Sequence, residues 1–308
     1  MTEFHEFYMR RCLQLAALGR GFVSPNPMVG AVIVHGGRII GESFHRRYGE
    51  AHAEVNAVSA VRDAGLLREA TLYVNLEPCS HYGKTPPCAE MIVHKGIPRV
   101  VIGHVDPYEE VSGGGIKILQ DAGVDVVCGV LERECKELNR RFLTFVEKRR
   151  PYVILKWAQS ADGFIDRTRS VGDGRRPVRI SSDFTKTIVH KHRAEEAAIM
   201  IGKRTLMLDE PRLDVRYWDG DNPVRFIADS RLTLKEQLQD MYEQGLQSLI
   251  VEGGARLINS FIEQRLWDEA DIETAFVCLG EGVRAPRPEG TVMSVMRCEG
   301  SFITRLRL

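Results

Sequence analysis

Short apolar runs alternate with amphipathic stretches twice along this chain, and the two series are separated by a basic run followed by a proline, Lys148-Arg149-Arg150-Pro151. Alternating strands and helices are typical of layered α/β domains. Proline ends the preceding helix, because it lacks a backbone donor and its ring clashes with the previous turn. The chain has 308 residues, more than one hydrophobic core usually serves. The pattern therefore predicts two α/β domains, at residues 1–148 and 149–308.

Apolar spacing and glycine punctuation predict the elements of each half. The first half is expected to contain a helix ending at Gly19, a hairpin of strands at 29–34 and 38–40, helices at 52–64, 88–95, 116–122 and 131–146, and strands at 71–76, 99–103 and 124–127. The second half is expected to contain strands at 152–155, 198–201, 224–228 and 248–252, helices at 184–193, 235–244 and 255–263, and further strands at the C-terminus.

The overall charge limits the classes of partner. The 42 Lys and Arg residues balance the 42 Asp and Glu residues, whereas nucleic-acid binding calls for a basic surface. No stretch approaches the roughly 18 apolar residues of a membrane span, and the N-terminal MTEFHEFYMRR is charged where a signal peptide needs an apolar core. We therefore expect a cytoplasmic protein without nucleic-acid or membrane partners. The seven scattered cysteines favour metal binding or free thiols over a disulfide framework.

Four residues of the first half form a candidate metal site. His52 and Glu54 stand at the start of a predicted helix, while Cys79 follows a predicted strand and Cys88 begins the next helix. One imidazole and two thiolates are a ligand set of catalytic zinc that leaves the fourth position open. Glu54 would then move the proton of the activated water, as in zinc nucleobase deaminases, whose usual spacing is Pro-Cys-x-x-Cys. Eight residues separate Cys79 from Cys88 here, and a structural zinc site or two buried thiols is the alternative.

Three longer segments of the first half resemble the deaminase half of the bifunctional deaminase–reductase family of riboflavin biosynthesis. They are Pro25-Asn26-Pro27-Met28-Val29-Gly30, His52-Ala53-Glu54-Val55-Asn56-Ala57 and residues 77–88, where the eight-residue insertion is part of the family pattern. The resemblance implies an α/β fold with an N-terminal cytidine-deaminase-like three-layer domain. It also implies zinc on His52, Cys79 and Cys88, a catalytic proton-transfer role for Glu54, and a phosphorylated pyrimidine bound by Asn26, His81 and Lys84.

Segments of the second half resemble the reductase half of the same family, whose fold is similar to dihydrofolate reductase. They are residues 156–163, 202–205, 209–216 and 252–254, and the chain has no Gly-x-Gly-x-x-Gly fingerprint of a Rossmann domain. The resemblance implies substrate contacts from Arg193, Leu213, Arg216 and Glu252. It implies NADPH as a cofactor, contacted by Ala158, Thr205, Asp209, Ser230, Gly254, Ala255, Arg256, Leu257, Ile258, Asn259 and Ser260.

These features predict a zinc-dependent deaminase joined to an NADPH-dependent reductase. The resemblance implies deamination of a diamino-ribosylaminopyrimidinone 5′-phosphate, then reduction of 5-amino-6-(5-phosphoribosylamino)uracil to the ribityl product. We also expect a homo-oligomer. The second domain looks shortened near residues 232–236, so the alternative is a deaminase whose second domain is catalytically impaired and serves folding or oligomerisation. A nucleic-acid editing deaminase is a third hypothesis, against which the even charge and the second enzyme-like domain argue.

Overall fold

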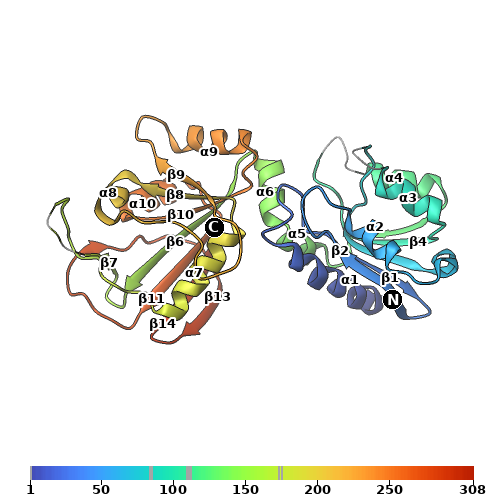
Figure 1. Ribbon diagram of the computed structural model, residues 1–308, viewed down its shortest axis with the longest axis horizontal. Coiled ribbons are helices and arrows are strands. Elements are labelled where there is room, and N and C mark those ends of the chain that lie inside the picture. Colours follow the sequence, from blue (N-terminus) through green and yellow to red (C-terminus); the bar gives the residue numbers. More distant parts are fainter. Residues whose placement is uncertain (1, 83–85, 109–112, 173, 175) are drawn as a thin grey trace. The chain divides into compact units, whose positions relative to one another are not determined.

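The computed structural model describes residues 2–82, 86–108, 113–172, 174 and 176–308. These residues form two compact units, Met1–Lys148 and Arg149–Leu308, and each unit is a sheet with helices on both faces (Figure 1). None of the described helices combines the length and the apolar character needed to cross a bilayer.

The first unit is built on a five-stranded sheet in the order β2-β1-β3-β4-β5. β1 pairs antiparallel with both β2 and β3, whereas β3, β4 and β5 run parallel. The predicted hairpin is therefore confirmed. The strands are β1 (Gly30–His35), β2 (Arg38–Phe44), β3 (Thr71–Leu76), β4 (Arg99–His104) and β5 (Asp125–Cys128).

Helices cover both faces of this sheet, as the three-layer prediction requires. On one face, Met9 and Cys12 of the first helix pack with Val32 and Tyr73 of the strands. On the other face, Ile33 and its neighbours pack against three further helices. The helices are α1 (Thr2–Ala16), α2 (Ala53–Ser59), α3 (Cys88–Lys95), α4 (Gly114–Asp121), α5 (Glu132–Leu138) and α6 (Arg140–Lys148), with α1 and α5 on the first face and α2, α3 and α4 on the second.

Two predicted helices are wrong in length. The helix predicted at 52–64 stops at Ser59, and a 3₁₀ turn (Ala64–Glu69) follows, capped by the Asp63 side chain that accepts the Gly65 N–H. The helix predicted at 131–146 is divided between α5 and α6. Asn139 lies at the break, and its side chain is buried. It accepts the Met28 N–H at 2.8 Å and donates to the Met28 carbonyl at 3.0 Å.

The second unit contains a seven-stranded sheet in the order β13-β14-β11-β6-β10-β8-β9. The strands from β11 to β9 run parallel, and β14 and β13 are antiparallel to their neighbours. The strands are β6 (Tyr152–Ser160), β8 (Ala198–Gly202), β9 (Val224–Ala228), β10 (Ser248–Glu252), β11 (Glu269–Ala275), β13 (Thr291–Cys298) and β14 (Ser301–Arg307), and a separate pair consists of β7 (Phe164–Asp166) and β12 (Val283–Arg284).

Helices again flank the sheet. α9 (Leu234–Glu243) and α10 (Ala255–Glu263) pack on one face in a core with Trp267, while α7 (Asp183–Glu195) covers the opposite face (Figure 1). A short helix, α8 (Lys203–Asp209), follows β8 directly and had no counterpart in the expected elements. Because β6, β10, β8 and β9 are parallel, their carboxyl ends meet at one edge of the sheet, which is where ligands bind in open α/β sheets.

Candidate metal centre and cofactor cleft

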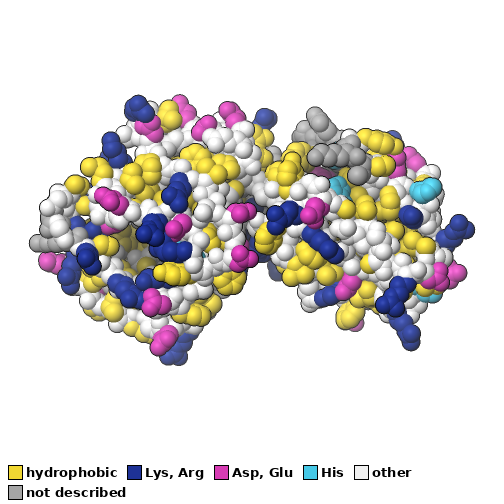
Figure 2. Space-filling model, viewed as in Figure 1, with side chains coloured by type: hydrophobic (Ala, Val, Ile, Leu, Met, Phe, Trp, Pro, Cys, Tyr) yellow, Lys and Arg dark blue, Asp and Glu magenta, His cyan; other side chains and the backbone are white. Residues whose placement is uncertain are grey.

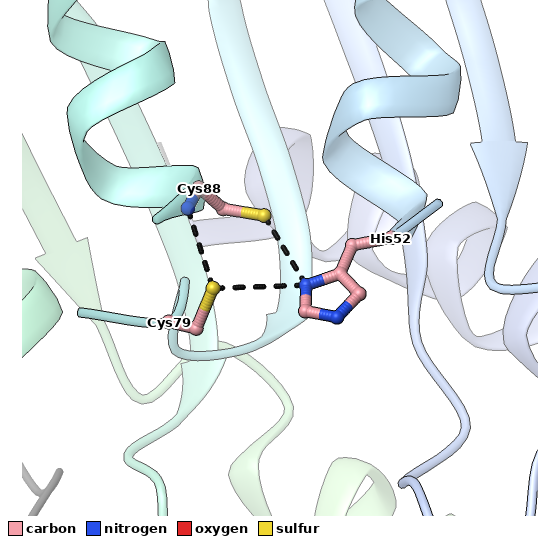
Figure 3. A group of neighbouring side chains, drawn as sticks. All are labelled: His52, Cys79 and Cys88. Atoms are coloured by element: carbon pink, nitrogen blue, oxygen red, sulfur yellow. Dashed lines mark hydrogen bonds between the residues drawn. The ribbon is translucent and has the colours of Figure 1, made fainter. Parts of the chain in front are cut away.

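Three predicted zinc ligands of the first unit meet in space. One ligand atom each from His52, Cys79 and Cys88 lies within 4.8 Å of the others. His52 Nδ1 is 3.6 Å from Cys79 Sγ and 3.4 Å from Cys88 Sγ (Figure 3). One nitrogen and two sulfur ligands suit zinc, and three protein ligands leave a fourth position for water or substrate. The donor set therefore fits a catalytic zinc ion.

Two helix starts and one strand end hold this triad. His52 directly precedes α2, Cys88 is the first residue of α3, and Cys79 follows β3 after Glu77 and Pro78. The Cys88 N–H donates to Cys79 Sγ at 3.3 Å, and the Ala89 N–H donates to the Cys79 carbonyl at 3.2 Å. A helix N-terminus favours anions because its first N–H groups are unpaired and its dipole is positive there. The N–H donated by Cys88 thus favours a thiolate at Cys79, where the metal needs one.

Electrostatic coupling within the triad concentrates negative charge on one sulfur. The hydrogen bond from Cys88 lowers the pKa of Cys79 to about 4, with His52 contributing in the same direction. The pKa of Cys88 is raised, because its proton is held by Cys79 and its side chain is buried. The hydrogen bond to Cys79 raises the pKa of His52. Cys79 is therefore the sulfur that loses its proton more readily.

Glu54 lies beside the triad without belonging to it. Its side chain is buried, and burial raises the pKa of its carboxyl, with the nearby Cys79 adding to the effect. It also interacts with the Cys88 side chain. A buried carboxyl beside the candidate metal ligands, with its pKa raised, has the properties of a general base. Glu54 therefore stands where a proton can be taken from water and passed on.

The residues predicted to contact the pyrimidine differ in how they are placed relative to the triad. The Asn26 side chain is within hydrogen-bonding distance of His45 Nε2, at 3.0 Å, and the His45 ring packs edge-on against the His52 ring with centroids 5.6 Å apart. His81 is exposed. Burial raises the pKa of the Asp106 carboxyl, and nearby His81 acts in the opposite direction. Lys84 lies outside the described residues. The structure thus brings Asn26 to the metal centre through His45, which the sequence analysis did not single out.

Glu77 is a further residue whose role the sequence did not reveal. Its carboxylate is buried and accepts N–H groups from Asp106 and Gly113 on one oxygen, and from Gly115 at 2.9 Å and Ile116 at 3.1 Å on the other. A side chain at Gly115 would collide with the backbone behind Glu77, because its Cβ would lie 1.9 Å from the Pro78 carbonyl oxygen. Glu77 therefore ties the strand that carries Cys79 to the start of α4.

The second unit has a cleft of about 1760 Å³ at the carboxyl ends of β6, β10, β8 and β9. Lys and Arg side chains lie around the hollowed surface of this unit (Figure 2). Single small-molecule sites usually occupy about 300–1,000 Å³, so this cleft can hold two ligands together. The predicted cofactor contacts that line it are Ala158, Thr205, Asp209, Ser230, Gly254, Ala255, Arg256, Leu257 and Ser260.

A glycine pair forms the floor of this cleft at the start of α10. Gly253 adopts φ +148°, which disfavours residues with a side chain, and a Cβ there would lie 3.4 Å from Thr205 Oγ1. The Gly254 N–H donates to the same Thr205 hydroxyl at 3.1 Å. The backbone is therefore bare at the start of α10, where a ligand can approach closely. This cradle fits the diphosphate of a dinucleotide.

One buried arginine pairs with two carboxylates that line the cleft. Arg169 donates to Asp166 and to Asp209, in both cases at 2.6 Å, and its side chain is buried. Asp209 therefore carries a partner already, although it was expected to contact the cofactor. Arg204 donates to the Arg169 carbonyl at 2.8 Å and fixes the same segment from the other side.

Three of the predicted substrate contacts, Arg193, Arg216 and Glu252, form one connected group. Of the four, only Glu252 lines the cleft in the described part of the chain. Arg193 and Glu252 pair through two hydrogen bonds, of 2.9 and 2.7 Å. Burial would raise the pKa of Glu252, but the Arg193 guanidinium holds it below its usual value. Arg193 also donates to the carbonyl of Asp214, whose carboxylate pairs with Arg216. Leu213 is buried in a small apolar cluster.

Two residues predicted to contact the cofactor do not line the cleft. Ile258 is fully buried in the core of the second unit, and Asn259 is absent from the lining residues of the cleft. A helix presents only part of its residues to one side, so a continuous run such as 254–260 cannot face one ligand throughout.

Comparisons with known proteins agree with both sites. Residues 2–104 match the cytidine and deoxycytidylate deaminase zinc-binding region, and residues 151–239 and 231–305 match the RibD C-terminal domain. The riboflavin biosynthesis protein RibD of Aquifex aeolicus is 34% identical, covering 92% of this chain and 90% of the relative. A crystal structure of a diaminohydroxyphosphoribosylaminopyrimidine deaminase/5-amino-6-(5-phosphoribosylamino)uracil reductase from Thermotoga maritima superposes with a TM-score of 0.89 at 33% identity, covering 99% of both chains. RibD of Acinetobacter baumannii gives a TM-score of 0.90 at 29% identity, covering 100% of this chain and 99% of the other.

Fold and sites together define a zinc-dependent deaminase domain joined to an NADPH-dependent reductase domain. The chain belongs to the RibD family of riboflavin biosynthesis proteins. The predicted family, the two-part α/β fold class, the two enzyme classes and the cofactors zinc and NADPH are thereby confirmed. The alternative of a deaminase with an impaired second domain is not favoured, because the second half matches the reductase-domain model as well.

Proposed function

We propose that this chain catalyses two successive steps of riboflavin biosynthesis. The first is hydrolytic deamination of 2,5-diamino-6-ribosylamino-4(3H)-pyrimidinone 5′-phosphate, and the second is reduction of 5-amino-6-(5-phosphoribosylamino)uracil. The observation that carries the proposal is the buried carboxyl of Glu54 beside three ligand atoms that lie within 4.8 Å of one another. That arrangement is the one hydrolytic deamination needs, and the family supplies the substrates.

In the first step, each residue at the metal centre has a separate role. His52, Cys79 and Cys88 would hold zinc, which lowers the pKa of water when it is bound. Glu54 would take a proton from water and deliver it to the departing amine, because burial raises the pKa of its carboxyl and makes it a better proton acceptor. Asn26, held by His45, offers its amide to the edge of the heterocycle, and His81 and Lys84 are assigned to the phosphate.

In the second step, the cleft of the second unit orients two ligands. NADPH supplies the hydride when bound, and Thr205 with the Gly253-Gly254 cradle would hold its diphosphate. Arg193 and Glu252, with Arg216 linked to them through Asp214, are assigned to the phosphoribosyl substrate. Such positioning accounts for much of the rate enhancement when two bound ligands react. A displacement of the reacting groups by about 1 Å can lower the rate on the order of a hundredfold.

We assign deamination to residues 1–148 and reduction to residues 149–308, with the second domain shortened near residues 232–236. The family model matches the second half in two pieces that overlap at residues 231–239, which supports a missing segment at this point. α9 begins directly after the turn, with Thr233 and Glu236 forming a capping box at its start. The cleft still contains groups from both sides of that turn, which supports an active reductase despite the shortening.

Two separate assays test the proposal with the purified chain. Ammonia release from the diaminopyrimidine phosphate measures the first activity, and loss of nicotinamide absorbance with the deaminated intermediate and NADPH measures the second. We expect both activities in the same preparation. Absence of ammonia release would refute the role of the metal centre, and absence of NADPH oxidation would refute that of the cleft.

We further propose that the chain is a homo-oligomer that works in the cytoplasm on a small phosphorylated pyrimidine, without a nucleic-acid or membrane partner. The edge strand β13 supports self-association, because its Val292, Met293, Val295 and Met296 side chains are between 43% and 59% exposed. An apolar edge strand is a template for pairing with another strand. The seven cysteines are all free thiols, which suits a reducing compartment.

Val295→Lys should convert the oligomer to a monomer, because a lysine on the edge strand opposes strand pairing. Size-exclusion chromatography with light scattering would measure the mass. Val171→Lys, at another exposed valine of the same unit, is the matched control and should leave the mass unchanged. A wild-type mass of a single chain would contradict the self-association.

A further inference from the structure

Three acidic side chains of β11 lie on the face of the second unit's sheet that α7 covers. Glu269, Asp271 and Glu273 alternate along the strand and are each at most 4% exposed, so they share one face of the sheet. The Asp271 carboxylate lies 3.3 Å from Nδ1 of His192 on α7. The face beneath α7 therefore holds a row of buried carboxyl groups.

Two of these carboxyl groups have a basic partner, and the third differs from them. Arg305 donates to Asp271 at 2.8 and 2.9 Å and lies 3.0 Å from Glu269. In the described part of the chain, Glu273 accepts its hydrogen bond from the Ser181 hydroxyl, at 2.5 Å to Oε2. The other carboxyl oxygen, Oε1, is buried and has no hydrogen-bond partner among the described residues. The cost of burying Glu273 is therefore only partly offset by its contacts within the fold.

Ser181 links Glu273 to the cleft of the second unit. Glu273 lies in register with Ala158 of β6. Both Ala158 and Ser181 line the cleft, whereas Glu273 is not among the described residues that line it. Two residues earlier on β6, Lys156 lies in register with Glu252 of β10. Since Glu252 belongs to the group assigned to the substrate, Ser181 lies at the substrate side of the cleft.

The hydrogen bond to Glu273 determines how the Ser181 hydroxyl can meet a ligand. A hydroxyl has one proton to donate and two lone pairs that accept. Its proton is directed to the carboxyl oxygen, in a contact whose length is typical of a charge-assisted hydrogen bond, so only the lone pairs remain for the cleft. The hydroxyl therefore accepts a hydrogen bond from a ligand. The ribose hydroxyls and the amine groups of a phosphoribosylamino pyrimidine are donors of this kind.

We propose that Glu273 is a positioning residue of the reductase, which holds the Ser181 hydroxyl as an acceptor for a ribose hydroxyl or amine of the substrate. This assignment rests on the proposed reductase function. It explains why the sheet contains a buried carboxyl group that its surroundings stabilise poorly, because that group orients a contact at the cleft. Since Glu273 does not itself line the cleft, its replacement acts on the substrate only through Ser181.

A double-mutant cycle on NADPH oxidation by the full chain tests this assignment, with the deaminated intermediate as the varied substrate. Ser181→Ala should raise KM about tenfold, as expected for one lost hydrogen bond, and leave kcat within about twofold of the wild type. Ser181→Thr keeps the hydroxyl and should keep KM within about threefold. Glu273→Gln should raise KM about threefold to tenfold, because its amide can donate to Ser181 and release the hydroxyl proton toward the cleft. The double variant Ser181→Ala with Glu273→Gln should resemble Ser181→Ala alone, because the effects of coupled residues do not add.

Thermal unfolding and NADPH binding distinguish positioning from a purely structural role. Glu273→Met replaces the carboxyl group by an apolar side chain of similar length, so the unfolding temperature should be equal to that of the wild type or higher. KM should nevertheless rise as in Glu273→Gln. Calorimetric titration with NADPH should give affinities within about twofold of the wild type for both Glu273 variants. Glu289→Gln, at an exposed glutamate of the same unit, is the matched control and should change none of these quantities.

Each contrary result has a distinct meaning. A KM of Glu273→Gln within twofold of the wild type, or effects that multiply in the double variant, would overturn the assignment while leaving the reductase function in place. A lower unfolding temperature together with lost NADPH binding in both Glu273 variants would make Glu273 a structural residue and would overturn the assignment as well. If the wild type oxidised no NADPH, the proposed reductase function itself would be refuted, and the assignment with it.

Discussion

Glu54→Gln should leave zinc in place and reduce deamination by about 10²- to 10⁴-fold, the usual contribution of a positioned acid–base group. The amide keeps the shape of the carboxyl but cannot accept a proton. Because Glu54 is outside the three ligand atoms that meet at the metal centre, its replacement should not release the metal. Zinc content and ammonia release would be measured in the same preparation.

Glu69→Gln is the matched control for this variant. Glu69 lies in the same unit with its side chain 79% exposed, so its replacement should change neither zinc content nor ammonia release. Deamination by Glu54→Gln within threefold of the wild type would show that another group moves the proton. Zinc loss in Glu54→Gln would instead place Glu54 in the ligand set.

Cys88→Ser should remove zinc and abolish deamination together. A serine hydroxyl is a poor substitute for a thiolate, and Cys88 contacts both other ligands, through its N–H to Cys79 and its sulfur to His52. Metal binding is linked to folding where the ligands come from separate elements, so the first unit should also unfold at a lower temperature. Elemental analysis and calorimetric melting would measure the two effects.

Two controls separate metal loss from general damage. Cys128→Ser changes an exposed cysteine of the same unit and should keep zinc and activity. NADPH oxidation with the deaminated intermediate should persist in Cys88→Ser, because that reaction is assigned to the second unit. Retention of about one zinc per chain by Cys88→Ser would contradict the ligand assignment.

Local sequence was sufficient to predict the metal centre, since its ligands lie at element ends that the sequence marks clearly. Strand β3 and helix α3 coincide with the predicted ranges. The residue types are those zinc prefers, and a helix start next to a strand end brings them together.

The supporting residues could not be predicted in the same way, because their partners are distant in sequence. Glu77 binds backbone N–H groups 29 to 39 positions further on, and Asn139 binds Met28 across 111 positions. Apolar periodicity continues through Asn139, so one helix was expected where the tertiary contact makes two. His45 likewise acquires its place only when β2 brings it next to His52.

In the second unit, the sequence predicted which segments border the cleft better than which of their side chains line it. The predicted contacts at 254–257 line the cleft, while Ile258 points into the core. A family segment carried over as a continuous run ignores the rotation of a helix by about 100° per residue. The Asp229–Arg231 ion pair lies at the cleft because β9 ends there, and local sequence does not predict that position.

The most direct test of two linked activities on one chain is the stoichiometry of a single reaction. The purified protein is given the diaminopyrimidine phosphate and NADPH, and ammonia and oxidised NADP are measured together until the substrate is consumed. Two active domains predict one NADPH oxidised for each ammonia released. Glu54→Gln should suppress both products, and supplying the deaminated intermediate should restore NADPH oxidation alone. Ammonia release without NADPH oxidation would contradict the account, because it would leave the second unit without its reaction.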